Sequence, residues 1–356
     1  MTQHYPLPPP NILSRLRQGQ VIPAHPLALT PEHKLDERHQ RALTRYYLAC
    51  GAGGLAVAVH TTQFAIHNPQ IGLLKPVLQL AKETSQDTNT IIIAGICGPT
   101  AQAISEARLA RDLGYHIGLL SLAALKTETE DRLIDHARAV AEVIPIMGFY
   151  LQPAVGGRCL SETFWQKLAD LPNLVGIKIA AFNRYQTLDV LRAVAQSGRA
   201  EQISLYTGND DNIVVDLLTK YEFTFGPHRT VPVPVAIVGG LLGHWAFWTK
   251  KAVELLDRVK AVRNDSSIPA DLLTLAAQVT ESNQAVFDPD HNFAGCVPGI
   301  MYILQRNGLV DHIRTFDEHE RLFPGQTERI EAIIRRYPHL TDDDFVREHI
   351  DQWLKP

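Results

Sequence analysis

The sequence has few cysteines, and they form no pattern that binds metal or builds a disulfide framework. Its 356 residues contain four cysteines, and no two of them have the Cys-x-x-Cys spacing. The 15 histidines are many for this length, yet they include no His-Glu-x-x-His motif. We therefore expect no metal site in this protein.

Long apolar runs and clusters of one charge are also missing. No run reaches the ~20 residues that a membrane-spanning helix needs, and the first ten residues lack the basic and apolar parts of a signal peptide. The 34 basic and 38 acidic residues give a net charge of −4 without a basic tract. This balance argues against binding to nucleic acid or to a membrane surface. We expect a cytoplasmic protein.

A glycine-rich phosphate loop is absent from the place where a dinucleotide-binding fold carries one. The cluster Gly51-Ala52-Gly53-Gly54 follows an expected helix and precedes an expected strand, which is the reverse order. It is typical of a helix end followed by a tight turn. The first expected strand ends instead at His25-Pro26. An open, doubly wound sheet is therefore the less favoured fold.

What is present is a regular alternation of short apolar strands and amphipathic helices. The expected strands cover residues 20–26, 55–62, 90–97, 116–122, 144–151, 174–180, 202–208 and 222–226, with seven expected helices between them. Units of roughly thirty residues, each with one strand and one helix, are typical of a barrel. We predict an α/β fold, an (α/β)8 TIM barrel with additional C-terminal helices.

Four regions follow from this interpretation. They are an N-terminal arm (1–19), the catalytic barrel (20–250), a C-terminal helical region (251–313) and a helical C-terminal extension (314–356). The proline-rich arm is expected to cover one end of the barrel. Residues 235–262 are apolar and are interpreted as helical, with Gly243 dividing two helices. Terminal helices of this kind more often cover a barrel or form a subunit contact than carry chemistry.

The expected strand Leu174–Ala180 carries a lysine near its end. Side chains alternate along a strand, so Gly176, Lys178 and Ala180 share one face. Neighbours this small leave empty space beside the lysine. If that face is buried, the amine loses its proton more readily and becomes a nucleophile towards carbonyl groups. A strand-end lysine that reaches solvent is the ordinary alternative.

In barrels, reactive groups lie at the C-terminal ends of the strands. The expected strands place there His25, His60, Thr61, Thr62, Tyr150, Gln152, Lys178 and Gly208, with Arg229 just beyond the last strand. A lysine, a tyrosine and two threonine hydroxyls at one mouth form a set suited to Schiff-base chemistry. Asn209 and Asp210, which follow Gly208, are interpreted as turn residues.

The same motifs resemble those of the dihydrodipicolinate synthase and N-acetylneuraminate lyase family of class I aldolases. The resemblance covers roughly residues 20 to 310. Its parts are Pro172–Lys178 for the lysine strand, Tyr150–Pro153 for a Tyr-x-x-Pro motif, Thr61-Thr62 for the paired threonines, Gly208–Asp210 for a Gly-Asp-Asp turn and Asn292–Leu309 for the final helix. Each part is weak alone, but all of them occur in the right order on the right expected strands.

The resemblance implies a lyase, either an aldolase or a hydro-lyase, that acts on a 2-oxo acid such as pyruvate or a keto-deoxy sugar acid. It implies that Lys178 forms the Schiff base, that Tyr150 moves protons with help from the Thr61 and Thr62 hydroxyls, and that backbone amides of the loop around Thr61 bind the carboxylate. His25, His60, Gln152 and Gly208 are further candidate substrate contacts. No cofactor is expected, because the protonated imine is itself the electron sink. A homodimer or homotetramer is expected.

Several positions depart from the family pattern. His60 and Gln63-Phe64 replace residues of its Gly-Thr-Thr-Gly-Glu loop, and Ala154-Val155 replaces the Gly-Arg that binds the second substrate of the synthases. Arg158 follows three residues later, and Arg229 is a candidate replacement anion contact or an ordinary surface arginine. These departures argue against the lysine-biosynthetic reaction. The alternatives are a 2-keto-3-deoxy sugar acid dehydratase and a non-catalytic barrel that binds a small molecule.

Overall fold

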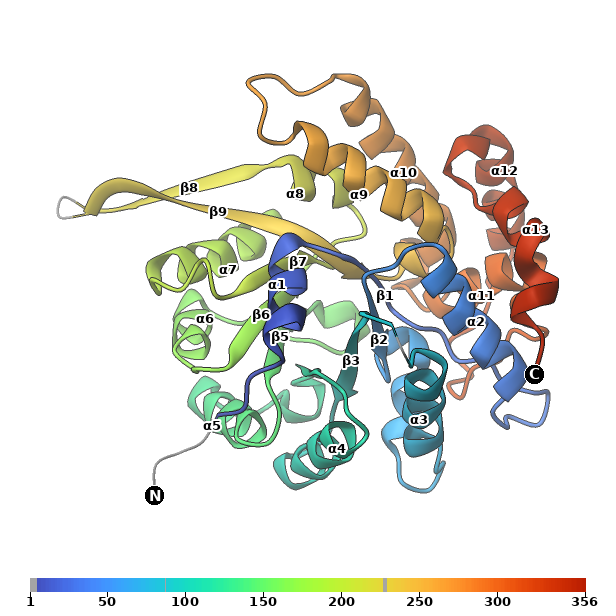
Figure 1. Cartoon of the computed structure of the whole chain (residues 1–356), viewed down its shortest axis with the longest axis horizontal. Coiled ribbons are helices and arrows are strands. Elements are labelled where there is room, and N and C mark those ends of the chain that lie inside the picture. The colour runs from blue at the N-terminus through green and yellow to red at the C-terminus, as the bar shows by residue number, and fades with distance from the viewer. Residues whose placement is uncertain (1–4, 87, 227–228) are drawn as a thin grey trace.

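A ring of parallel strands forms the centre of the molecule (Figure 1). The computed structural model describes residues 5–86, 88–226 and 229–356, without the side chains of Arg229 and Thr230. Within these residues, eight parallel strands follow one another in the order β1-β9-β7-β6-β5-β4-β3-β2. The ring closes between β1 and β2, where Ala24 bridges Ala56 and the His25 amide donates to the Ala56 carbonyl at 2.8 Å. The predicted (α/β)8 barrel is confirmed.

Apart from the first part of β9, the strands of the barrel are short, apolar and almost entirely buried. Their bounds are β1 (Val21–Pro23), β2 (Gly54–Val57), β3 (Ile91–Ile96), β4 (Ile117–Leu120), β5 (Ile146–Leu151), β6 (Leu174–Ala180), β7 (Ser204–Thr207) and β9 (Arg229–Leu242). Parallel strands that are covered on both faces are expected to be apolar throughout. For this reason, apolar runs in the sequence predicted most of the barrel strands.

Helices surround the ring and connect its strands (Figure 1). They are α2 (Glu37–Ala49), α3 (Leu74–Thr84), α4 (Thr100–Asp112), α5 (Glu130–Ala141), α6 (Glu162–Ala169), α7 (Arg184–Gln196), α8 (Ile213–Leu218) and α9 (Thr249–Val262). Several begin at a side chain that accepts from a free backbone amide, as Ser161 does for Phe164 and Asn183 does for Gln186. Their apolar faces and the outer faces of the strands form the larger hydrophobic core.

The N-terminal end of the barrel is closed by α1 (Pro10–Gln18), which lies across the centre of the ring in Figure 1. Ile12 and Leu16 join the apolar cluster inside the barrel. The hydroxyl of Tyr206 on β7 donates to the Leu16 carbonyl at 2.7 Å. With this end filled, the C-terminal end of the barrel is the one left for a binding site.

The prediction of the eighth strand was wrong. β8 (Lys220–Phe225) lies outside the ring and pairs antiparallel with the first part of β9, forming a hairpin that projects from the barrel (Figure 1). The second part of β9 is the barrel strand, with Ile237 opposite Leu205 and Gly240 opposite Val21.

The helix predicted over 235–262 is therefore wrong in its first part, because α9 begins only at Thr249. A short apolar run looks the same whether it forms a doubly buried strand or a buried helix. The glycines of this run allow neighbouring segments of the chain to pack closely against β9. A Cβ at Gly239, for example, would lie 2.6 Å from the backbone nitrogen of Gln20.

Four helices follow the barrel: α10 (Asp271–Phe287), α11 (Cys296–Arg306), α12 (Gln326–Arg336) and α13 (Asp343–Trp353). They pack beside α9 and α2 (Figure 1). Asp342 fastens the last of them to the barrel, since its carboxylate accepts from the Lys250 amide at 2.7 Å and from the Tyr46 hydroxyl at 2.7 Å. Among the described helices, none has the length and apolar character needed to span a bilayer.

Candidate active site

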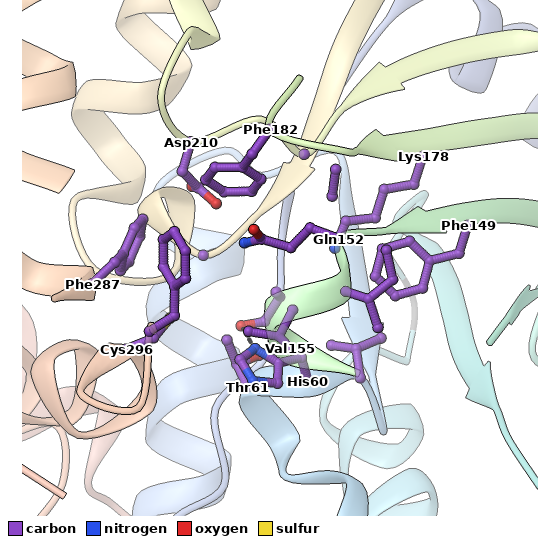
Figure 2. A pocket seen from close by; sticks show the side chains of 17 residues that line it. His60, Thr61, Phe149, Gln152, Val155, Lys178, Phe182, Asp210, Phe287 and Cys296 are labelled. Carbon is purple, nitrogen blue, oxygen red and sulfur yellow. Dashed lines mark hydrogen bonds between the residues drawn. The ribbon is translucent and has the colours of Figure 1, made fainter. Parts of the chain in front are cut away.

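A small cavity of about 60 Å³ lies at the C-terminal end of the barrel (Figure 2). We call it the lysine cavity because it contains the side chain of Lys178. The residues that line it are Ala24, Val59, His60, Thr61, Phe149, Leu151, Gln152, Val155, Lys178, Ala180, Phe182, Gly208, Asp210, Gly243, Phe287, Phe293 and Cys296. They come from β5, β6, several loops after strands, and the C-terminal helices.

Lys178 points into the barrel from β6 and is only 6% exposed. Gly176 and Ala180 share its face, as predicted, whereas a register shift at the start of β6 brings Val175 into the inner cluster as well. Burial lowers the pKa of the Lys178 amine to about 8, although the nearby Asp210 carboxylate opposes this shift. The amine is therefore neutral far more often near pH 7 than an ordinary lysine is.

Gly208, which follows β7, makes room for the lysine. A Cβ at this position would lie 2.8 Å from the Cε atom of Lys178 and 2.9 Å from the Cβ of Ala180. Both distances are shorter than a normal carbon–carbon contact. Glycine is thus required here by the space that the Lys178 side chain occupies.

Asp210 faces the same cavity from the loop after β7. Its Oδ1 atom accepts from the His244 amide at 3.1 Å, and burial raises the pKa of the carboxyl to about 7. The interpretation of Asp210 as a turn residue did not anticipate a carboxyl in the cavity. Two groups whose pKa values lie near neutrality, one amine and one carboxyl, are therefore within a single cavity.

Its neighbour Asn209 is a structural residue, as predicted. The Oδ1 atom of Asn209 accepts from the Phe182 amide at 2.9 Å, and its Nδ2 atom donates to Asp216 at 3.0 Å. Asp216 is fully buried, pairs with Arg184 and accepts from Thr207 at 2.7 Å. This network fixes the loops that follow β6 and β7, and so it fixes the positions of Phe182 and Asp210.

Tyr150 does not reach the cavity, contrary to the sequence-based expectation. Along β5, Phe149 is paired with Lys178 and Tyr150 with Ile179, so Tyr150 faces the outer helices. Its ring packs against Trp165 of α6 at 5.1 Å between centroids, and its hydroxyl accepts from the Leu160 amide at 3.2 Å. A Tyr-x-x-Pro motif does not reveal which face of the strand the tyrosine occupies.

His25 and Thr62 also lie behind the cavity wall rather than in it. The Nε2 atom of His25 is 2.8 Å from the hydroxyl of Thr44 on α2, and burial lowers the pKa of the imidazole to about 4. Thr62 donates to the His25 carbonyl at 2.6 Å and is fully buried. Both residues hold the ends of β1 and β2 together.

Four of the predicted contact residues do line the cavity: His60, Thr61, Gln152 and Gly208. His60 and Thr61 belong to a short 3-10 helix (His60–Thr62) after β2. The hydroxyl of Thr61 donates to the Ala24 carbonyl at 2.7 Å. The Nε2 atom of His60 lies 3.6 Å from the carboxylate of Glu320, in the C-terminal extension.

Of the two arginines that the sequence suggested as anion contacts, the structure describes the side chain of one. Arg158 donates to the carbonyls of Lys126 and Glu128, at 2.9 and 2.6 Å, and is not part of the cavity wall. Arg229 begins β9 in the projecting hairpin, but its side chain lies outside the described residues. Its role as an anion contact stays a prediction.

The described residues contain one group of side chains with metal-ligand geometry, away from the lysine cavity. Ligand atoms of Asp36, His39 and Asp311 lie within 4.8 Å of one another. Asp36 is already the N-terminal cap of α2, where it accepts from both the backbone and the ring of His39. This group is explained by helix capping.

The aromatic part of the cavity wall was not found from the sequence. Phe182 comes from the loop after β6. Phe287 at the end of α10 and Phe293 in the segment that follows lie about a hundred residues further along the chain. No spacing rule joins positions so far apart. The only local signal is that Phe182 follows the lysine strand by two residues.

Comparisons with known proteins agree with the barrel. A family model described as the dihydrodipicolinate synthetase family matches residues 18–226. A curated 4-hydroxy-tetrahydrodipicolinate synthase of Symbiobacterium thermophilum is 26% identical over 226 residues, which cover 62% of this chain and 71% of the relative. The corresponding synthase of a Cyanothece species is 28% identical over 206 residues, covering 56% and 66%.

Solved structures of similar fold cover more of the chain. A dihydrodipicolinate synthase from Acinetobacter baumannii, complexed with pyruvate, superposes with a TM-score of 0.71 at 18% identity, over 89% of this chain and 98% of that chain. An N-acetylneuraminate lyase from Fusobacterium nucleatum, also complexed with pyruvate, gives 0.69 at 14% identity, over 90% and 98%. At such low identity these likenesses establish the fold alone.

Proposed function

The chain belongs to the dihydrodipicolinate synthetase family, and from this premise we propose that it is a lyase that forms a Schiff base between Lys178 and a 2-oxo acid. The observation that carries the proposal is the buried amine of Lys178 at the C-terminal end of the barrel, with its pKa lowered to about 8. A neutral amine that is buried in a cavity is the group that captures a ketone.

The reaction would proceed in balanced steps. The neutral amine adds to the ketone carbon of the 2-oxo acid, and loss of water from the carbinolamine gives a protonated imine. In an aldol cleavage, the C4 hydroxyl loses its proton, the electron pair of the C3–C4 bond moves to the iminium, an aldehyde leaves, and the resulting enamine is protonated at C3. In a dehydration, a base removes the C3 proton, the electron pair of that bond moves to the iminium, and the resulting enamine expels the C4 hydroxyl as water after that hydroxyl is protonated. Hydrolysis then releases the product and restores the amine.

Asp210 is the proposed proton carrier. With a pKa of about 7 it is present as both acid and base near neutral pH, which suits general acid–base catalysis. As an acid it can protonate the departing hydroxyl of the carbinolamine, and as a carboxylate it can take the proton back. Tyr150 is not proposed for this role, because its hydroxyl contacts Leu160 outside the cavity.

The carboxylate of the substrate is proposed to bind near His60 and Thr61. Both residues line the lysine cavity at the end of β2, where they offer an imidazole and a hydroxyl. Gln152, at the end of β5, adds an amide to the wall of the same cavity. The His60 imidazole and the Gln152 amide can donate hydrogen bonds to a carboxylate. The Thr61 hydroxyl already donates to the Ala24 carbonyl, so Thr61 shapes this part of the wall.

The test is reductive trapping. The protein is incubated with pyruvate and sodium borohydride, and its intact mass is then measured. We expect one reduced pyruvate per chain in the wild type and in Lys167→Ala, which removes a surface lysine, and none in Lys178→Ala. Absence of the adduct in the wild type, or its persistence in Lys178→Ala, rules out the proposal.

One observation favours a second candidate, a barrel that binds a 2-oxo acid without turning it over. The outward position of Tyr150 leaves no phenol in the described wall of the lysine cavity. The trapping experiment, combined with an assay for released pyruvate, distinguishes the lyase from the binding protein. Trapping accompanied by release of pyruvate from 4-hydroxy-2-oxo acids supports the lyase, whereas trapping without release from any of them supports the binding protein.

A further inference from the structure

We propose that the substrate of this site carries an aromatic group, which binds in a subsite formed by Phe182, Phe287 and Phe293. We call these three residues the phenylalanine subsite. The inference rests on the proposed function, because it takes Lys178 as the residue that holds the 2-oxo acid end of the substrate.

The phenylalanine subsite forms one end of the lysine cavity. In Figure 2, Phe182 and Phe287 lie with Asp210 at the end away from Phe149. The rings of Phe182 and Phe293 are 5.4 Å apart between centroids and meet edge to face. This arrangement leaves ring faces and edges free to contact another aromatic ring, which favours offset or edge-to-face packing.

The three rings also line a second hollow, of about 220 Å³, that adjoins the lysine cavity. Its remaining walls include Thr280, Gln284 and Pro289. Because Phe182, Phe287 and Phe293 belong to the walls of both cavities, the two cavities meet at these rings. A group attached to the far end of a 2-oxo acid therefore has space to extend from Lys178 past the rings.

Backbone strain supports a binding role for two of the rings. Phe182 has a φ of +51° and Phe293 a φ of +64°, a left-handed conformation that costs free energy for any residue with a Cβ. The surrounding structure holds both in place, since the Phe182 amide donates to Asn209 at 2.9 Å and the Phe293 amide to the Asp288 carbonyl at 3.2 Å. Strained residues of this kind cluster at binding sites.

Part of the remaining wall is also apolar. Val155 lines the lysine cavity, and no arginine is among the described lining residues. The nearest arginine in the chain, Arg158, is bound to backbone carbonyls instead. This part of the site thus presents carbon atoms where a carboxylate would require a cation.

The C-terminal extension holds the phenylalanine subsite in position. Gln326, at the start of α12, is fully buried and donates to the carbonyls of Val286 and Gly295, at 2.9 Å each. These two carbonyls bracket the segment that carries Phe287 and Phe293. Arg329 adds an ion pair to Asp288 at 2.8 Å. Gln326 is therefore a positioning residue, and the extension shapes the specificity of the site.

The experiment compares three 2-oxo acids by borohydride trapping: pyruvate, 2-oxoglutarate and 4-phenyl-2-oxobutanoate. We expect the half-saturating concentration of the phenyl acid to lie at least about tenfold below that of 2-oxoglutarate, because aromatic burial gains affinity while a second carboxylate loses it. If pyruvate is trapped at Lys178 but the phenyl acid shows no such preference, the inference is overturned. If no acid is trapped, the proposed function itself fails.

Single substitutions test whether the preference for the phenyl acid comes from the phenylalanine subsite. Phe293→Ala should raise the half-saturating concentration of the phenyl acid, relative to that of pyruvate, by about tenfold. Phe345→Ala removes the same side chain from α13, far from the cavity, and should leave the ratio unchanged. Gln326→Ala should raise the ratio as well, since it releases the segment that carries two of the rings. A ratio that is the same in Phe293→Ala and in the wild type contradicts the subsite, even if the wild type prefers the phenyl acid.

Discussion

The Nζ atom of Lys178 lies 4.5 Å from the centroid of the Phe149 ring. The two residues are partners on neighbouring strands, so this contact follows from the register between β5 and β6. An aromatic face attracts the ammonium form of the lysine, whereas burial favours the neutral amine. Burial is the largest influence on the pKa of Lys178 and lowers it, while the Asp210 carboxylate acts in the opposite direction.

The first prediction concerns pH. Because the pKa of Lys178 is about 8, the rate of imine formation with pyruvate should rise about tenfold per pH unit below that value and level off above it. Stopped borohydride trapping at several pH values measures this rate. Asp210→Asn should move the midpoint to lower pH, because the Asp210 carboxylate raises the pKa of Lys178. A midpoint near that of a free lysine contradicts the prediction.

The same Asp210→Asn variant tests proton transfer. Loss of a general acid–base group typically lowers turnover by about 100- to 10,000-fold. We expect the variant to be trapped by pyruvate and borohydride at Lys178, but more slowly than the wild type at every pH, because the same carboxyl is proposed to protonate the departing hydroxyl of the carbinolamine. It should also lose turnover of any substrate found for the wild type. Equal turnover in the two proteins would exclude Asp210 as the proton carrier.

Lys178→Met should stabilise the protein. The pKa of Lys178 falls from 10.5 to about 8 on folding, so holding the buried ammonium costs about 3 kcal/mol at pH 7. This cost is fully present below pH 8, decreases as the pH rises towards 10.5, and is absent above it. We expect the free energy of unfolding at pH 7, measured in urea, to rise by about 2–3 kcal/mol. Lys167→Met, on the surface, should change it little.

Tyr150→Phe should leave trapping and turnover unchanged, because the hydroxyl of Tyr150 contacts Leu160 outside the lysine cavity. The variant should lose about 1 kcal/mol of stability with that hydrogen bond. Denaturant unfolding and trapping assays measure the two effects separately. A large fall in turnover with intact trapping would restore the proton-relay role that the sequence motif implied.

Gly208→Ala should block the lysine without unfolding the barrel. Its new Cβ would lie 2.8 Å from the Cε atom of Lys178, so the side chain must move and trapping should fall more than about tenfold. Gly198→Ala is the matched control, since no atom lies within 4 Å of its new Cβ. The control has a φ of +74° and should lose about 1 kcal/mol of stability while keeping full trapping.

The sequence predicted the bounds of an element best where the local pattern of residues matches the surroundings of that element in the fold. The bounds expected for the lysine strand, Leu174–Ala180, are those of β6, because turn residues flank a run of apolar and small side chains. The sequence pattern did not identify the eighth barrel strand, because the apolar run at residues 235–242 has no periodicity that distinguishes a strand from a helix. The antiparallel hairpin with β8 depends on pairing that local sequence does not encode.

The sequence by itself determined the order of the first seven barrel strands and of the helices between them, and it placed Lys178 on a face with Gly176 and Ala180. Both follow from chain periodicity, which is a local property. Only the tertiary structure decided that Phe149 rather than Tyr150 faces the lysine, that Asp210 shares its cavity, and that Phe287 and Phe293 complete the wall. These facts depend on strand register and on contacts between segments about a hundred residues apart, and such contacts are set by packing of the whole chain.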